Sequence, residues 1–140
     1  MQLTVLSIGR VPDPATRQLC EEYQKRLGRH LKVQLVEVRS AEEAMRRVEP
    51  LHHVIALTSG GVMRSSEDFA RWLDQKMTYG RSPLLFVIGG AEGLPATLGE
   101  RADEAISLGP MTLPHRLARV LLLEQLYRAL TILRGEPYHK

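Results

Sequence analysis

Two stretches in the last third of the chain decide the fold: Phe86-Val-Ile-Gly-Gly-Ala-Glu-Gly-Leu94 and Ser107-Leu-Gly-Pro-Met-Thr-Leu-Pro-His115. The first is an apolar strand that runs into two glycines, and the second is a strand end that runs into a tight loop and then a long helix. Loops of this kind, each following a strand, meet at one edge of an open α/β sheet, where such sheets bind ligands. Glycines let the backbone approach a small molecule closely, and backbone N–H and C=O groups suit an adenine and ribose better than a bare phosphate.

Strands and helices alternate along the rest of the chain. The continuous apolar run at residues 84–88 is typical of a strand that is covered on both faces. The residue patterns predict strands over 2–9, 32–38, 53–57, 84–88 and 104–108, and helices over 13–29, 40–48, 65–77 and 114–134. Ser40 with Glu43, and Ser65 with Asp68, have the spacing of helix-capping pairs. The sequence therefore predicts a single α/β domain over residues 1–140, with a mostly parallel sheet and helices on both faces.

The composition fits a soluble globular protein, with 44% hydrophobic and 25% charged residues in a chain of 140. No apolar run reaches the roughly 20 residues that span a bilayer, and the amino terminus lacks the basic segment of a signal peptide. Cys20 is the only cysteine, so an internal disulfide is impossible and a cytoplasmic location is favoured. We expect Cys20 to pack in the core rather than to act as a nucleophile.

The net charge of +3 is concentrated at the carboxyl-terminal end. Basic and acidic residues cancel over residues 1–114, so the whole excess lies in residues 115–140. A basic surface beside a ligand loop suits a polyanion such as RNA. Solvated cations on a helix would give the same charge, so both interpretations stay open.

The last predicted helix is apolar over most of its circumference. Such a helix is buried on more than one side, and in so small a protein a second subunit is a plausible cover. A single unusually enclosed core helix is the alternative. The apolar residues lie on two sides, namely Val120, Leu123, Tyr127 and Leu130 on one, and Ala118, Leu122, Ala129 and Leu133 on the other.

Several common sites are excluded by spacing. The glycines at 89, 90 and 93 lack the spacing of a dinucleotide-binding loop and the Lys-Ser/Thr of a P-loop. No Gly-x-Ser-x-Gly hydrolase motif is present. We predict no metal site, because the five histidines (His30, His52, His53, His115 and His139) are scattered without ligand spacing.

The chain resembles the ribosomal RNA large subunit methyltransferase H family, which belongs to the SPOUT class of S-adenosylmethionine-dependent RNA methyltransferases. The resemblance implies a C-terminal trefoil knot, a homodimer, and methylation of N3 of a pseudouridine in 23S rRNA, with the ribosome as partner. The matching residues are Gly89-Gly90-x-Glu92-Gly93-Leu94, Met111-Thr-Leu-Pro-His115, Arg119-Val-Leu, Glu124-Gln-Leu-Tyr-Arg-Ala129 and Pro137-Tyr-His139, with a shorter match at Ile8-Gly9-Arg10.

The resemblance also assigns the two loops to S-adenosylmethionine, with the end of the third strand as another wall. The cofactor-binding residues would be Leu57, Gly89, Gly90, Leu108, Gly109, Pro110, Met111, Thr112, Leu113 and Pro114. Relatives often have Asp and Lys where this chain has Thr58 and Val62, which leaves the role of that loop open.

Methyl transfer to N3 requires loss of the proton on that nitrogen, so a base or a stabilising cation would help. The candidate catalytic residues are His139, Tyr138, Arg128 and Arg119. In a dimer the terminal Tyr138-His-Lys140 would be able to close over the partner's cofactor, whereas a frayed end is the alternative.

Three rival functions follow from the same residues. The first is the same chemistry on another RNA such as tRNA, and the second is a non-catalytic ribosome- or RNA-binding protein of this fold. The third is a nucleotide-binding α/β module without an RNA partner. Intact cofactor loops argue against the second, and the basic tail argues against the third.

Overall fold

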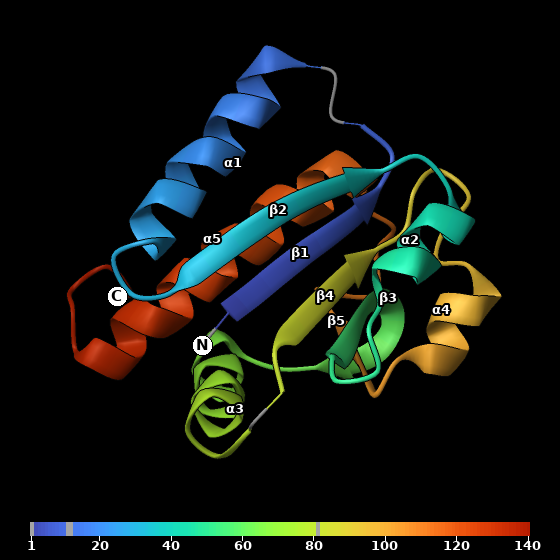
Figure 1. Cartoon of the computed structure of the whole chain (residues 1–140). Helices are drawn as coiled ribbons and strands as arrows, with labels where there is room; N and C mark the ends of the chain where they lie inside the picture. The colour runs from blue at the N-terminus through green and yellow to red at the C-terminus, as the bar shows by residue number, and fades with distance from the viewer. Residues whose placement is uncertain (1, 11–12, 81) are drawn as a thin grey trace.

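A five-stranded parallel sheet organises the protein, in a computed structural model that describes residues 2–10, 13–80 and 82–140. The strand order is β2-β1-β4-β3-β5, and all four strand pairs are parallel. Three helices cover one face and two cover the other (Figure 1). The predicted α/β architecture is thus confirmed. The strands are β1 (Gln2–Ile8), β2 (Lys32–Val38), β3 (His53–Met63), β4 (Leu84–Ile88) and β5 (Glu104–Ser107). The helices are α1 (Pro14–Leu27), α2 (Ala41–Arg47), α3 (Ser66–Tyr79), α4 (Ala96–Arg101) and α5 (His115–Arg134).

The side-chain alternation of β4 divides the interior into two cores. Leu84, Phe86 and Ile88 pack with α1, α3 and α5 on one face of the sheet. Leu85 and Val87 pack with α2 and α4 on the other face. All five residues of β4 are buried, as expected for a strand covered on both sides.

Two elements differ from the sequence-based expectation. The strand predicted to end at Leu57 continues to Met63, because the chain bulges between Leu57 and Val62 and both of these residues pair with Ile106. Helix α4 was not predicted, since it has only six residues, contains Gly99 and begins without a side-chain cap. Both departures lie on segments that flank the loops following β3 and β4.

The helix starts follow the predicted capping chemistry. The Ser40 hydroxyl accepts the backbone N–H of Glu43 at the start of α2, and the Ser65 hydroxyl accepts that of Asp68 at the start of α3. Gly135 ends α5 in the left-handed conformation, with φ of 69°. These caps fix where α3 begins and where α5 ends.

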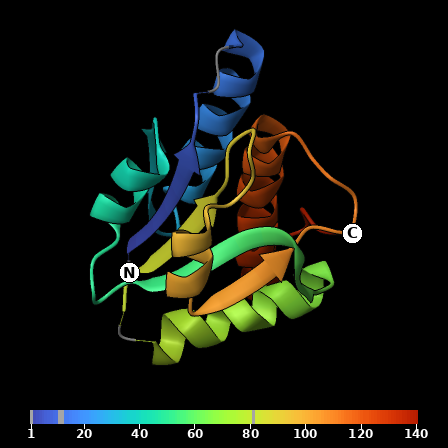
Figure 2. The same cartoon turned by 90° about the vertical axis from the view of Figure 1, so that its right-hand side faces the viewer.

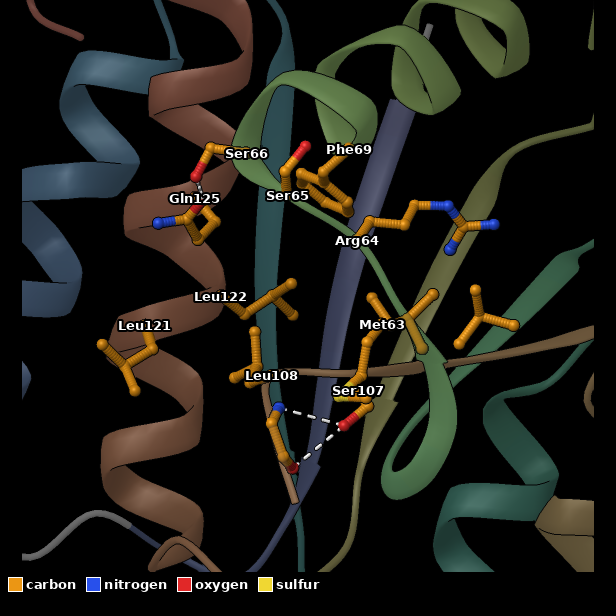
Figure 3. Close-up of a pocket in the computed structure, with 13 residues that line it drawn as sticks. Met63, Arg64, Ser65, Ser66, Phe69, Ser107, Leu108, Leu121, Leu122 and Gln125 are labelled. Atoms are coloured by element: carbon orange, nitrogen blue, oxygen red, sulfur yellow. Dashed lines mark hydrogen bonds between the residues drawn. The ribbon is translucent and has the colours of Figure 1, made fainter. Parts of the chain in front are cut away.

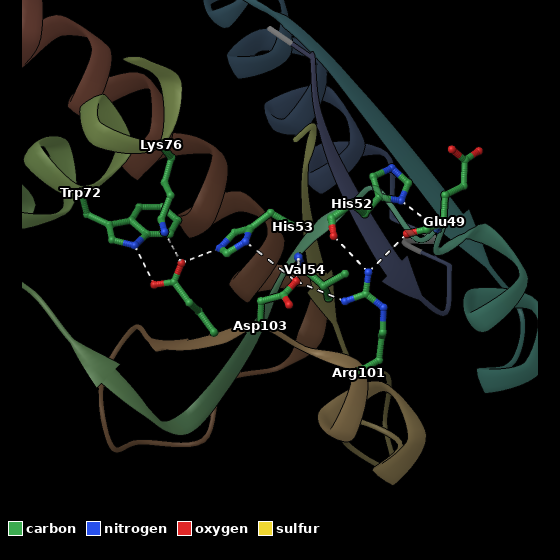
Figure 4. Close-up of polar contacts among 9 residues, drawn as sticks. Glu49, His52, His53, Val54, Trp72, Lys76, Arg101 and Asp103 are labelled. Atoms are coloured by element: carbon green, nitrogen blue, oxygen red, sulfur yellow. Dashed lines mark hydrogen bonds and ion pairs between the residues drawn. The ribbon is translucent and has the colours of Figure 1, made fainter. Parts of the chain in front are cut away.

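A polar network joins the amino ends of β3 and β5 to α3 (Figure 4). Glu104 receives hydrogen bonds from Trp72 Nε1 at 2.9 Å and from Lys76 Nζ at 2.8 Å, and it lies 2.6 Å from His53 Nε2. Burial by itself would raise the pKa of Glu104, but bonds from Lys76, His53 and Trp72 outweigh burial and hold the pKa at about 2. Both carboxylate oxygens of Glu104 therefore have partners. The network lies at the edge of the sheet opposite the carboxyl ends of the strands.

Cys20 is buried in the core on α1, as predicted. Burial raises the pKa of its thiol, which keeps it protonated and unreactive. Within the described residues, no helix combines the length and apolar character needed to cross a bilayer.

Candidate cofactor and methyl-transfer site

A cavity with a volume of about 660 Å³ lies at the carboxyl edge of the sheet. Three chain segments build it: the bulge of β3, the loop after β4, and the loop between β5 and α5. Its size falls in the range of small-molecule sites. The lining residues are Leu57, Thr58, Ser59, Ile88, Gly89, Gly90, Ala91, Gly93, Leu94, Leu108, Gly109, Met111, Thr112, Leu113, Pro114, His115 and Ala118.

Nine of the ten predicted cofactor residues surround this one cavity. Pro110 is the exception, because it is exposed and does not line the space. Eight further residues line the cavity and were not among the predicted cofactor residues. They are Ile88, Ala91, Gly93, Leu94, His115 and Ala118, in or near the two quoted stretches, and Thr58 and Ser59, which follow the predicted Leu57. A glycine at the end of a strand indicates a loop, but it does not show which neighbouring residues face the cavity.

The glycines after β4 are required by backbone packing. A Cβ on Gly89 would lie 2.4 Å from the carbonyl carbon of Gly93, and one on Gly90 would lie 2.8 Å from the carbonyl oxygen of Ile8. Gly93, with φ of 81°, closes the turn through a hydrogen bond from its N–H to the Gly90 carbonyl at 2.9 Å. These glycines therefore let the loop fold on itself and against the end of β1.

Ser107 joins two walls of the cavity. Its hydroxyl lies 3.1 Å from the Ser59 carbonyl oxygen and 2.9 Å from the Gly109 carbonyl oxygen, and it accepts the Gly109 N–H at 3.0 Å. The side chain is buried. It ties the β3 bulge to the loop after β5, so it fixes the width of the cavity.

The charge of the lining limits what this cavity binds. Among the described residues, the lining contains no Lys, Arg, Asp or Glu, and His115 is its single titratable side chain. A phosphate-rich nucleotide would lack cationic partners there. An adenosine moiety with a sulfonium suits the lining. Apolar walls and backbone groups recognise the adenosine, and no cation of the lining repels the positively charged sulfonium.

Arg119 lies away from the other three candidate catalytic residues. Its side chain points to the end of β1, where Nη2 donates to the Gly9 carbonyl at 3.4 Å and Nη1 lies 3.4 Å from Glu37. The residue is only 5% exposed. His115 lies beside it, with Nε2 3.4 Å from the Arg10 carbonyl oxygen. Arg119 therefore contacts the loop after β1 rather than the molecular surface.

The carboxyl-terminal tail is docked on its own chain by two carboxylates. Tyr138 donates to Glu124 at 2.7 Å, and Arg128 binds the same carboxylate at 2.8 and 3.2 Å. His139 lies 2.5 Å from Glu67 on α3 and 2.9 Å from Nη1 of Arg128. The Tyr138 ring also packs edge-on against Tyr127, with centroids 4.7 Å apart. The structure thus brings three of the four predicted catalytic residues together and orders the tail.

These contacts shift the ionisation of the tail cluster, which we define as Glu67, Glu124, Arg128, Tyr138 and His139. Burial, followed by hydrogen bonds with Tyr23 and Glu124, raises the pKa of Tyr138 and keeps it protonated. Burial would raise the pKa of Glu124, but hydrogen bonds from Arg128 and Tyr138 outweigh it and lower the pKa. The hydrogen bond with His139 lowers the pKa of Glu67. Both carboxylates are therefore ionised at neutral pH.

A second cavity of about 410 Å³ lies beside the first one, which we call the cofactor cavity after its expected ligand; Figure 3 shows the residues that line the second cavity. It shares Leu108 and Gly109 with the first cavity. Ser66 and Gln125 close its other end through a hydrogen bond of 2.7 Å, and these residues are next to Glu67 and Glu124 in the sequence. Figure 2 shows α3 and α5 on the same side of the sheet. The site is therefore a series of cofactor cavity, second cavity and tail cluster.

An exposed apolar rim borders the second cavity. Val62 and Met63 at the end of β3 and Leu121 on α5 line the cavity, and exposed Leu117 lies one helical turn before Leu121 on α5. Met63 is 65% exposed and Leu121 is 41% exposed. Grouped apolar side chains of this kind mark a surface that is suited to a protein partner.

The comparisons with known proteins agree with this architecture. A family model described as "Predicted SPOUT methyltransferase" matches residues 1–139. Ribosomal RNA large subunit methyltransferase H of Listeria monocytogenes serotype 4a is 42% identical to this chain, and that of an Exiguobacterium species is 40% identical. Both alignments cover 100% of each chain.

Solved structures share the fold at low sequence identity. A probable methyltransferase from Bordetella pertussis Tohama I has a TM-score of 0.58 and 15% identity, and the match covers 92% of this chain and 93% of that one. Ribosomal RNA small subunit methyltransferase E from Neisseria gonorrhoeae, bound to S-adenosyl methionine, has a TM-score of 0.55 and 13% identity over 95% of this chain and 66% of that one. The family match and the full-length relatives together show that this chain belongs to the SPOUT methyltransferases, within the ribosomal RNA large subunit methyltransferase H family.

Proposed function

We propose that this protein transfers a methyl group from S-adenosylmethionine to N3 of a pseudouridine in 23S rRNA of the large ribosomal subunit. Family membership over the full length supports the reaction and the substrate. The observation that carries the proposal is the cofactor cavity, whose lining lacks Lys, Arg, Asp and Glu among the described residues and comes from the β3 bulge and two glycine-containing loops.

The cofactor cavity would hold S-adenosylmethionine between the loops after β4 and β5. When bound, the cofactor supplies an electrophilic methyl group, so the protein has to place the acceptor nitrogen and remove its proton. Leu57, Gly90 and Leu113 represent the three walls that would contact it. The second cavity, which shares Leu108 and Gly109 with the first, is suited to the acceptor base.

The tail cluster would supply the groups that act on the acceptor. Arg128 provides a fixed cation beside His139, which suits an anionic uracil ring. Buried Arg119 suits a different role, because its guanidinium holds the Gly9 carbonyl of the loop after β1. We therefore place His139, Tyr138 and Arg128 near the acceptor and assign Arg119 to positioning.

The protein would work as a homodimer in the cytoplasm, with one domain per chain and the trefoil knot of its family. The apolar rim of Val62, Met63, Leu117 and Leu121 supports the dimer, because a second copy seated there would bury these side chains. The same contact would cover the second cavity, so each site would draw on two chains.

Mass analysis of RNA nucleosides from cells with and without this gene tests the function. We expect methylated pseudouridine to disappear from 23S rRNA in the deletion strain and to return with the plasmid-borne gene. Loss of a tRNA nucleoside instead would support the rival substrate. An unchanged set of nucleosides in every RNA would refute a methyltransferase role.

A further inference from the structure

The two ring nitrogens of His139 have chemically different partners. Nδ1 lies 2.9 Å from Nη1 of Arg128, and Nε2 lies 2.5 Å from Oε1 of Glu67. A guanidinium has only N–H donors, so Nδ1 must accept the hydrogen bond from Arg128. This arrangement places the ring proton on Nε2, which donates to Glu67.

We propose that Glu67 is the positioning residue for His139: it holds the Nε2–H and so directs the Nδ1 lone pair toward the methyl acceptor. This inference rests on the proposed function and deepens it. In this arrangement one imidazole nitrogen acts as the base, and a carboxylate bound to the other nitrogen orients the ring. Glu67 is well placed for this role, because it follows Ser66, which lines the second cavity.

The proton transfer follows from this tautomer. The N3–H of the acceptor replaces Arg128 as the donor to Nδ1, and the proton moves from N3 to Nδ1. The N3 electron pair then bonds to the methyl carbon as the carbon–sulfur bond of the cofactor breaks, and that pair stays on sulfur. The imidazolium, stabilised by Glu67 through Nε2–H, later releases its proton to water.

Arg128 does not have to move far to release Nδ1. Its Nε and Nη2 remain bound to Glu124 at 3.2 and 2.8 Å, so only the Nη1 contact is exchanged. The other groups of the cluster are unsuited to act as the base. Tyr138 donates to Glu124, and Glu124 itself is occupied by Arg128 and Tyr138. Among the residues that the structure describes, the charged groups in contact with the His139 ring are Glu67 from α3 and Arg128 from α5.

The tautomer can be measured without RNA or cofactor. Long-range proton–nitrogen NMR of the imidazole rings, assigned with His139→Ala, should show Nε2 protonated in the wild-type protein. Glu67→Ala should release this fixed tautomer. Asp68→Asn removes an acidic group from the same turn of α3, where it pairs with Arg71, and should leave the spectrum unchanged. A wild-type ring protonated at Nδ1, or an unchanged ring in Glu67→Ala, would overturn the assignment.

Kinetics then test the role in methyl transfer. Glu67→Gln should lower kcat by roughly tenfold or more, while KM for ribosomes and the cofactor Kd stay within about twofold of wild type. The acidic limb of the rate–pH profile should move to lower pH, because an amide stabilises an imidazolium less than a carboxylate does. Asp68→Asn should behave like wild type.

A double variant separates positioning from a general structural effect. In a His139→Ala background, Glu67→Gln should cause no further loss of rate. An equal loss in both backgrounds would show that Glu67 acts independently of His139. A wild-type protein that methylates no RNA would refute the proposed function instead, and the NMR measurement would still decide the tautomer.

Discussion

The Ser107 hydroxyl lies 3.1 Å from the carbonyl oxygen of Ser59, and thereby joins the end of β5 to the bulge of β3. The Ser107 hydroxyl oxygen also accepts the N–H of Gly109 at 3.0 Å. Ser59 and Gly109 belong to different walls of the cofactor cavity. A single buried hydroxyl therefore sets the distance between two segments that are far apart in the sequence.

Replacing Ser107 by Ala should weaken S-adenosylmethionine binding about fivefold and reduce stability by about 1 kcal/mol, because the partly buried Gly109 N–H loses its partner. Calorimetry and thermal unfolding measure the two effects. Ser40→Ala is the matched control, since it removes a capping hydroxyl from the start of α2, which does not line the cavity. That control should lose stability and keep its affinity. Unchanged affinity in a folded Ser107→Ala protein would contradict the role of Ser107.

Filling the cavity from an exposed lining position should abolish cofactor binding without disturbing the core. Thr112→Trp places an indole at the cavity wall, whereas Thr97→Trp places one on exposed α4. We expect at least a tenfold loss of affinity from the first substitution only. Gly90→Leu is a less specific probe, because its Cβ would meet the Ile8 carbonyl oxygen at 2.8 Å. Equal affinities of the two Trp variants would rule out this cavity as the cofactor site.

A charge on the apolar rim should separate the proposed dimer. Leu121→Glu would place a carboxylate in the contact, so light scattering should give a mass near the 15.8 kDa of one chain. Leu51 is 75% exposed and lies in the turn before β3, so Leu51→Glu should keep twice that mass. A monomeric wild-type protein that still methylates RNA would refute the dimer.

Deletion of Tyr138 to Lys140 should leave cofactor binding intact and lower methyl transfer steeply. The tail contacts α3 and α5 rather than the cofactor cavity, and its groups act mainly in the transition state. The deletion should also reduce stability by about 1 kcal/mol, because the Tyr138 ring leaves Tyr127. Cofactor titration measures binding, and single-turnover rates on ribosomes measure methyl transfer. Full activity of the truncated protein would show that the tail is dispensable.

Glu104→Gln should destabilise the protein at neutral pH but not in strong acid. The pKa of Glu104 falls from 4.5 to about 2 on folding, so its ionised form stabilises the fold fully above about pH 5. This contribution is lost as the pH drops from about 4.5 to about 2. At pH 7 we expect the free energy of unfolding of Glu104→Gln to be about 2 kcal/mol lower than that of wild type, as measured by urea unfolding. Glu100→Gln, on the exposed side of α4, is the control. If the difference in free energy of unfolding between wild type and Glu104→Gln did not change with pH, the stabilising role of the Glu104 ion pairs would be contradicted.

The sequence by itself was sufficient to predict the parallel α/β class, most strand and helix positions, and the segments around the cofactor cavity. These features depend on local properties: the apolar run of residues 84–88, the capping serines at 40 and 65, and glycines at strand ends. Each is determined by backbone conformation or side-chain periodicity within a few residues, so neighbouring residues are enough to indicate it.

Only the tertiary structure decided how the candidate catalytic residues are arranged. Arg119 belongs to a basic segment and looks like a surface cation, but it is buried and contacts the Gly9 carbonyl and Glu37 inside the protein. The tail looks like a frayed end, but Glu67, 72 residues away from His139, fixes its position. The β3 bulge likewise depends on Ile106. Contacts between residues so far apart leave no local pattern in the sequence, because they arise only when packing brings β1, α3 and α5 together.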